Sequence, residues 1–156
     1  QYTSNILDTR ISRMNEEERE KFESLQSSLK GPNNYDKDKL FAQLGDLMTK
    51  VDAYDPNLSE RESPKCRFDI NKKVWNEAVQ LRRNGALTEA VGNIQCPIVA
   101  IHGDHDPHPA AGIKEPLARM NDNFRFILLE KCGHEPWIEK HAKDEFYETL
   151  KDICSG

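Results

Sequence analysis

The chain has 156 residues, the usual length of about one domain, and its 27 acidic and 22 basic residues give a net charge of −5. This charge argues against nucleic-acid and anionic-membrane binding, since contact with phosphate requires a basic face. No apolar run approaches the roughly 18 residues of a transmembrane helix. Four widely spaced cysteines with no Cys-x-x-Cys pair indicate a reduced, cytoplasmic protein.

In residues 1–94 the apolar residues recur at three- and four-residue intervals, and this spacing predicts helices separated by polar linkers. Asn15 and Glu18 have the spacing of a capping box at a helix start. Gly31 and Pro32 predict the end of that helix, and Asp36 precedes the next one. The apolar stripes span residues 6–14, 22–29, 40–51 and 74–81.

In residues 95–156 the pattern of apolar residues predicts four elements in the order strand, helix, strand, helix. Cys96–Gly103 and Phe124–Leu129 are short apolar runs, and such strands are typical of a parallel sheet buried on both faces. Residues 113–120 show helical spacing between them. After the second run, Pro136 is expected to open a helix that places Ile138, Ala142, Phe146, Leu150 and Ile153 inward.

Two short parallel strands leave both outer edges of their sheet unpaired. The pattern therefore requires more strands than the sequence supplies. We accordingly expect the biological start of the protein to lie before Gln1.

Polar residues follow both predicted strands. The first strand leads into residues 102–109, which hold three histidines and two aspartates, and the second leads into residues 131–137. In α/β sheets the chemistry occurs beyond the carboxyl ends of the strands, and adjacent parallel strands bring two such loops together. A carboxylate on one loop and an imidazole on the other predict an oriented general base.

The segment from Cys96 to His134 resembles the C-terminal part of the α/β-hydrolase fold. In that family one strand ends in Gly-x-x-Asp, as Gly103 to Asp106 does, and the last strand ends in Gly-His, as Gly133-His134 does. The resemblance implies that Asp106 is the catalytic acid and His134 the general base. Among these enzymes the chain is similar to proline iminopeptidases.

The same resemblance implies a fold and a domain organisation. Residues 1–94 stand where many such enzymes insert a helical cap, and residues 95–156 would be the last two parallel strands and helices of the hydrolase sheet. The complete enzyme would be a cytoplasmic serine hydrolase acting on a small ester or peptide substrate. It would need no cofactor, metal, nucleic acid or membrane, and self-association remains open.

The family's nucleophile lies on a Gly-x-Ser-x-Gly turn, and none of the serines here has glycines two residues before and after it. The resemblance therefore implies that an N-terminal half carries the serine and is the partner of this segment. Alone, the segment would be inactive, because no acyl-enzyme can form without a nucleophile.

Several alternatives remain open at the sequence level. The helical residues 1–94 can be a non-catalytic interaction module, and Asp104 can replace Asp106 as the acid. The histidines and aspartates of residues 102–108 can bind a metal ion, although consecutive loop residues rarely converge on one ion. Cys132 is interpreted as a packing residue, and Trp75 and Trp137 as core residues, although Trp137 follows the base closely and can line a substrate site instead.

Overall fold

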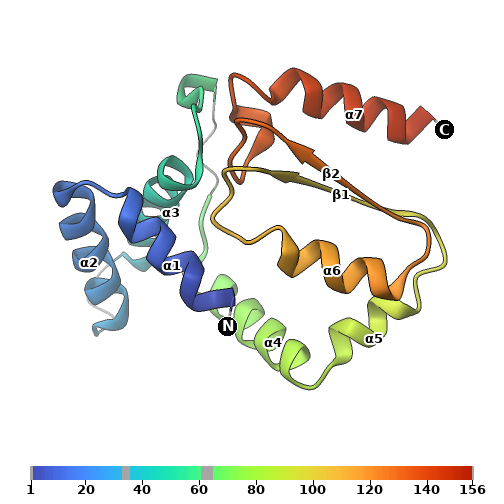
Figure 1. Ribbon diagram of the computed structural model, residues 1–156. Helices are drawn as coiled ribbons and strands as arrows, with labels where there is room; N and C mark the ends of the chain where they lie inside the picture. The colour runs from blue at the N-terminus through green and yellow to red at the C-terminus, as the bar shows by residue number, and fades with distance from the viewer. Residues whose placement is uncertain (1, 33–35, 61–64, 156) are drawn as a thin grey trace.

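The computed structural model describes residues 2–32, 36–60 and 65–155, and Figure 1 shows its elements. The described chain is a mixed α/β structure, mostly helical, with a two-stranded parallel sheet. The helices are α1 (Tyr2–Arg13), α2 (Glu16–Lys30), α3 (Lys37–Asp52), α4 (Phe68–Arg83), α5 (Ala86–Gly92), α6 (Ala111–Met120) and α7 (Lys143–Ser155). The strands are β1 (Ile98–Gly103) and β2 (Phe124–Leu129), and the short 3-10 helices are η1 (Leu58–Glu60) and η2 (Pro136–Ile138).

Of the first three helices, α2 and α3 begin as the sequence predicts. Asn15 accepts a hydrogen bond from the Glu18 backbone, and the Glu18 carboxylate accepts one from the Asn15 backbone, which confirms the capping box. Asp36 caps α3 by accepting from the backbone N–H of Lys39. These caps satisfy backbone donors that a helix start otherwise leaves free. The three helices pack around a buried cluster of Met14, Phe22, Leu47 and Val51.

Helix α4 has no buried residue, unlike α2 and α3. Its Trp75 is 59% exposed, so the prediction that this side chain is a core residue was wrong. The helix ends at Asn84, and Gly85 turns the chain with a φ of 81°, a left-handed conformation that favours glycine. Helix α5 follows directly and was not anticipated from the apolar pattern.

The strand–helix–strand–helix order of the C-terminal segment is confirmed. β1 and β2 pair in parallel, with Ile98 opposite Phe124 and Gly103 opposite Leu129. The sheet lies between α6 and α7 (Figure 1), so its two faces are covered by different helices. Burial is nonetheless incomplete, since Leu128 is 49% exposed, and within the described residues neither outer edge of the sheet has a strand partner.

The final helix does not begin at Pro136, and that prediction was wrong. Pro136 starts only the 3-10 turn η2, the backbone is extended at Glu139, and α7 begins at Lys143. The helix is interrupted because the Glu139 side chain turns inward and is fully buried. Its carboxylate accepts hydrogen bonds from three backbone N–H groups, those of Tyr54, Asp55 and Gly133, at 2.7–2.8 Å.

Glu139 thus joins residues 1–94, here called the helical segment, to the loop after β2. Three further backbone hydrogen bonds run between the same parts: His134 donates to the Asp52 carbonyl at 3.1 Å, Asn57 donates to the Ile138 carbonyl at 2.7 Å, and Lys140 donates to the Asp55 carbonyl at 3.1 Å. The end of α3 and the loop after β2 are therefore packed together with their polar backbone groups satisfied, as buried backbone requires.

Candidate active site

The loops that follow β1 and β2 meet at the carboxyl end of the sheet, and they bring together the two residues predicted to act as acid and base. Asp106 lies in the first loop and His134 in the second. His134 donates from Nδ1 to Asp106 Oδ2 over 2.8 Å. Residues 28 positions apart in the sequence thereby form a direct imidazole–carboxylate contact, because the strands before them are parallel neighbours in register.

Two glycines allow this approach of the loops. A Cβ atom on Gly103 would lie 2.2 Å from the Cys132 carbonyl oxygen, and one on Gly133 would lie 2.2 Å from the Asp52 carbonyl oxygen. Both neighbours are backbone atoms of packed segments, which cannot move aside as the end of a flexible side chain can. The two glycines of the sequence motifs are therefore needed for close packing, whatever chemistry the site performs.

Asp104 holds the two loops together and lies away from the imidazole pair. Its Oδ1 accepts a hydrogen bond from the Cys132 N–H at 3.1 Å, and its own N–H donates to the Leu129 carbonyl at 2.9 Å. His105 adds a third bond between the loops, from its N–H to the Cys132 carbonyl. Among the described residues, the His134 imidazole hydrogen-bonds to the Asp106 carboxylate and not to that of Asp104. This geometry favours Asp106 over Asp104 as the acid.

Burial and hydrogen bonding set the charges of the pair. The Asp106 side chain is only 7% exposed. Burial acts to raise the pKa of Asp106, but hydrogen bonds from His108 and His134 outweigh it and hold that pKa well below its usual range. The hydrogen bond to Asp106 raises the pKa of His134 above 6.5, against the opposing effect of burial. Asp106 therefore stabilises the protonated form of His134, as a general base requires.

His108 is a third member of the site that the sequence motifs did not indicate. Its backbone N–H and its Nδ1 both lie within hydrogen-bond distance of Asp106 Oδ1, at 2.8 and 2.7 Å. The rings of His108 and His134 are 4.7 Å apart and tilted by 30°. Each oxygen of the Asp106 carboxylate thus contacts one imidazole. The sequence signal that could have indicated His108 is its position two residues after Asp106, because an aspartate side chain often accepts a hydrogen bond from the backbone N–H two residues later.

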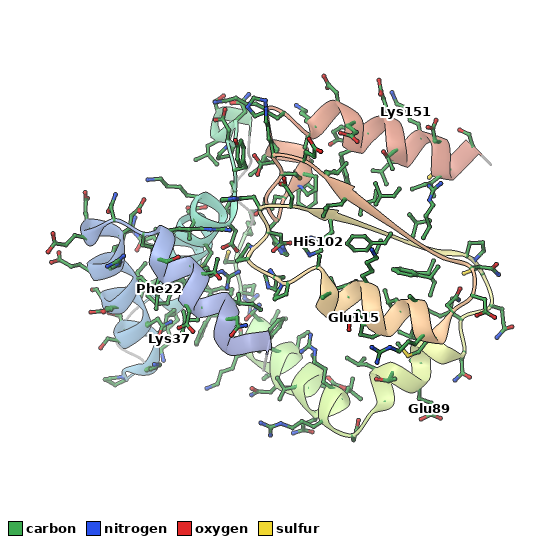
Figure 2. All side chains as sticks on the ribbon, in the orientation of Figure 1. Phe22, Lys37, Glu89, His102, Glu115 and Lys151 are labelled. Atoms are coloured by element: carbon green, nitrogen blue, oxygen red, sulfur yellow. The ribbon has the colours of Figure 1, made fainter. Side chains whose placement is uncertain are left out.

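His102, the next-to-last residue of β1, also lies beside Asp106. Its side chain is buried on the side of the sheet that faces α6 (Figure 2). Nδ1 lies 2.8 Å from the Gly103 carbonyl oxygen, which is an acceptor, so Nδ1 carries the proton. Nε2 has no hydrogen-bond partner among the described residues and lies 3.7 Å from Asp106 Oδ2.

The helical segment also reaches the site. Arg10 pairs with the buried Asp52, whose carbonyl accepts from the His134 N–H. Arg13 donates to the His105 carbonyl at 2.8 Å. Burial, assisted by the Arg13 charge, lowers the pKa of His105 below 6.5. A hollow beside this contact is lined by both segments, through Arg13, Glu18, Lys50, Val51, Ala53 and His105.

Cys132 is unsuited to act as a nucleophile. Its side chain is fully buried, and burial raises the pKa of the thiol to about 12, so the reactive thiolate is absent near neutral pH. The prediction of a packing role is confirmed by its place in a cluster with Leu129 and Ala142. Trp137, by contrast, is 46% exposed, and its assignment to the core was wrong.

No protein-family model, curated protein or solved structure matches this chain. In the parts of the chain that the structure describes, every helix is too short or too polar to cross a membrane.

Proposed function

We propose that this chain is the cap and C-terminal part of an α/β serine hydrolase, in which it supplies the acid and the base of the catalytic triad. The observation that supports the proposal best is the 2.8 Å contact between His134 Nδ1 and Asp106 Oδ2. The two residues follow adjacent parallel strands at the carboxyl end of the sheet, as the acid and base of that family do. The substrate class is an ester or an amide bond.

In this function Asp106 holds the imidazole with its proton on Nδ1, which leaves Nε2 free to accept a proton. His134 takes the proton of a serine hydroxyl as the serine attacks the carbonyl carbon, and it then gives that proton to the leaving group. A water molecule then attacks the acyl-enzyme in the same way, with His134 first taking its proton and then returning a proton to the serine oxygen. The negative charge of Asp106 stabilises the imidazolium at each step, consistent with the raised pKa of His134.

The helical segment fits the role of a cap over the substrate. It contacts the catalytic loops directly, through the Asp52 carbonyl and Arg13, and it lines a hollow together with His105. The uncovered sheet edges fit the remaining part of the proposal, since strands of a nucleophile-bearing polypeptide would pair there. That polypeptide carries Gly-x-Ser-x-Gly and lies outside these 156 residues.

The test is to express this chain with a polypeptide that carries the Gly-x-Ser-x-Gly turn and the preceding strands, either fused or as a second chain. Hydrolysis of a p-nitrophenyl ester and of an aminoacyl p-nitroanilide is then measured. We expect His134→Ala to lower kcat by at least about a thousandfold, because a triad without its base retains only binding and oxyanion stabilisation.

His141→Ala is the matched control, since this histidine is also exposed but lies beside Asp55. It should leave kcat within about twofold. A loss below tenfold for His134→Ala, or an equal loss for His141→Ala, would reject the assignment.

One observation favours the alternative function, a non-catalytic helical interaction module. Helix α4 exposes Ile70, Val74 and Trp75, which are 50–59% accessible and lie on one side at helical spacing. Such a face is typical of a surface that another protein or domain covers. The experiment above separates the two functions, because hydrolysis that depends on His134 excludes a purely non-catalytic role.

A further inference from the structure

The side chains around Asp106 have the composition of a metal site. Asp106, His108 and His134 each offer one ligand atom, and these atoms all lie within 4.8 Å of one another. Two imidazoles and one carboxylate are ligands that zinc and the neighbouring transition metals prefer. The residues come from both loops, so the set is produced by the fold and not by consecutive residues of one loop.

His102 provides an independent observation. Its side chain is 5% exposed, and its Nε2 atom finds no hydrogen-bond partner in the described part of the chain. Nδ1 donates its N–H to the Gly103 carbonyl, so Nε2 is the ring atom that faces the Asp106 carboxylate. A buried polar atom without a hydrogen-bond partner beside a carboxylate calls for a cation at this place. A metal ligand whose other ring nitrogen donates to a carbonyl has this same arrangement.

The distances fit a small tetrahedral ion. Ligand atoms of a tetrahedral zinc site lie about 3.3 Å apart, given zinc–nitrogen and zinc–oxygen bonds of about 2.0–2.1 Å. The 3.7 Å between His102 Nε2 and Asp106 Oδ2 is close to this spacing. The 2.8 Å contact of His134 Nδ1 with the same Oδ2 atom needs to open by about half an ångström to meet this spacing. His108 Nδ1 lies beside the other oxygen, Oδ1, and within 4.8 Å of the ligand atoms that Asp106 and His134 offer.

We propose that Asp106, His108, His134 and His102 bind one zinc ion. His102 offers Nε2, His108 and His134 offer Nδ1, and Asp106 offers one oxygen. His108 and His134 lie in loops and are 34% and 50% exposed, so their rings can adjust and the ion can enter from solvent. Cys132 is not a ligand, because its buried thiol keeps its proton and bonds to the Gly133 carbonyl.

Zinc would switch off the base, a consequence that rests on the proposed function. A ring whose Nδ1 binds the ion keeps its one proton on Nε2. Nε2 is the atom that must accept the proton of the serine, so the metal-bound His134 cannot act as a base. The ion also removes the hydrogen bond between His134 and Asp106. Zinc binding is thereby the regulation that this geometry predicts for the site.

The experiment is a calorimetric titration of the metal-free 156-residue chain with Zn²⁺ at pH 7.5, repeated with Co²⁺ by visible absorption. Cys66, Cys96 and Cys154 are replaced by serine in every sample, because accessible thiols bind zinc themselves. We expect one ion per chain and the intense absorption of tetrahedral cobalt. His108→Ala and His134→Ala should each weaken binding at least tenfold, and His141→Ala should not.

His108 and His134 are chosen because both are partly exposed and both variants should fold, which circular dichroism checks. His102→Ala tests the buried ligand and should change the cobalt spectrum as one nitrogen ligand is lost. The proposal is overturned by the absence of saturable binding at one equivalent. It is also overturned if His108→Ala binds as tightly as the parent chain, or if His141→Ala weakens binding equally.

Inhibition is measured separately on the completed hydrolase, so that the two proposals fail independently. Zinc should abolish hydrolysis and EDTA should restore it. For each enzyme, the zinc concentration that halves its own metal-free rate is determined. This concentration should be at least tenfold higher for His108→Ala than for the parent enzyme. Tight zinc binding to the chain without any hydrolysis by the completed protein would overturn the proposed function and leave the metal site intact. Hydrolysis by the completed protein without any zinc binding would overturn the metal site and leave the proposed function intact.

Discussion

Asp106 uses both of its oxygens, and this governs the protonation of the imidazoles beside it. His134 donates to one oxygen, and the other is taken by the backbone and ring of His108. Since the pKa of Asp106 is lowered from 3.8 and that of His134 is raised from 6.5, the ion pair stabilises the fold fully between these two ordinary values. This stabilisation is lost as pH falls through the lowered pKa of Asp106 or rises through the raised pKa of His134.

We predict that Asp106→Asn lowers the pKa of His134. The amide carries no charge, so it no longer favours the imidazolium, and burial then acts in the opposite direction. The measurement is an NMR titration of the His134 ring protons between pH 4 and pH 9, with EDTA present to exclude metal. The wild-type midpoint should lie above 6.5 and the variant midpoint below it.

The resonances of His141 serve as the internal control, since its ring lies beside Asp55 and not beside Asp106. Their titration should be the same in both proteins. An unchanged His134 midpoint in Asp106→Asn would show that the contact between these two side chains does not form in solution.

At this scale the sequence indicated some members of the site and not others. Asp106 and His134 follow glycines at the ends of the two predicted strands, and the resemblance of these motifs to the α/β-hydrolase fold named the pair, while Asp104 stayed open as the acid. His108 and His102 could not be assigned to the acid, because their places depend on how the loop turns after Gly103. Glu139 was missed as well, since its three backbone donors come from residues far away in the chain or across a turn.

The two loops at the end of the sheet depend on glycine for backbone packing. At Gly103 and Gly133 an added Cβ would meet backbone oxygen at 2.2 Å, whereas Gly45 in α3 has nothing within 4 Å of such an atom. The same substitution should therefore have opposite effects at the two kinds of position. The difference lies in the neighbouring segments, not in the glycine itself.

We predict that Gly133→Ala lowers the thermal midpoint and Gly45→Ala raises it. Forcing apart the loop and the end of α3 should cost at least about 1–3 kcal/mol, as overpacking does. Alanine in the open middle of a helix should gain about 0.5–1 kcal/mol. Circular dichroism melting of both variants beside the parent chain measures the two shifts. A Gly133→Ala chain that melts at or above the parent midpoint would contradict the close packing.

Elements with local signals were predictable and those set by distant contacts were not. The starts of α2 and α3 follow from Asn15, Glu18 and Asp36, whose side chains act within three residues. The interruption before α7 does not follow from any local pattern. It arises because Glu139 turns inward to bond with a segment more than eighty residues away.

The whole molecule combines well-packed interfaces with surfaces that nothing in the described chain covers. Helices α6 and α7 cover the faces of the sheet, and α1 to α3 are joined to its loops. The outer edges of β1 and β2 carry unpaired backbone groups, and two strands of six residues are too few for an independently stable sheet. Helix α4 exposes a separate apolar face.

We predict that the isolated chain self-associates through the sheet edges, because free strand edges pair with any available strand. Light scattering after size-exclusion chromatography should give a mass that rises with protein concentration. Trp75→Gln removes the largest exposed side chain of α4 and should leave the association unchanged if the edges cause it. Addition of the nucleophile-bearing polypeptide should replace the aggregates by a one-to-one complex. A concentration-independent monomer with a sharp two-state transition would instead show that the two-stranded sheet is stable without further strands.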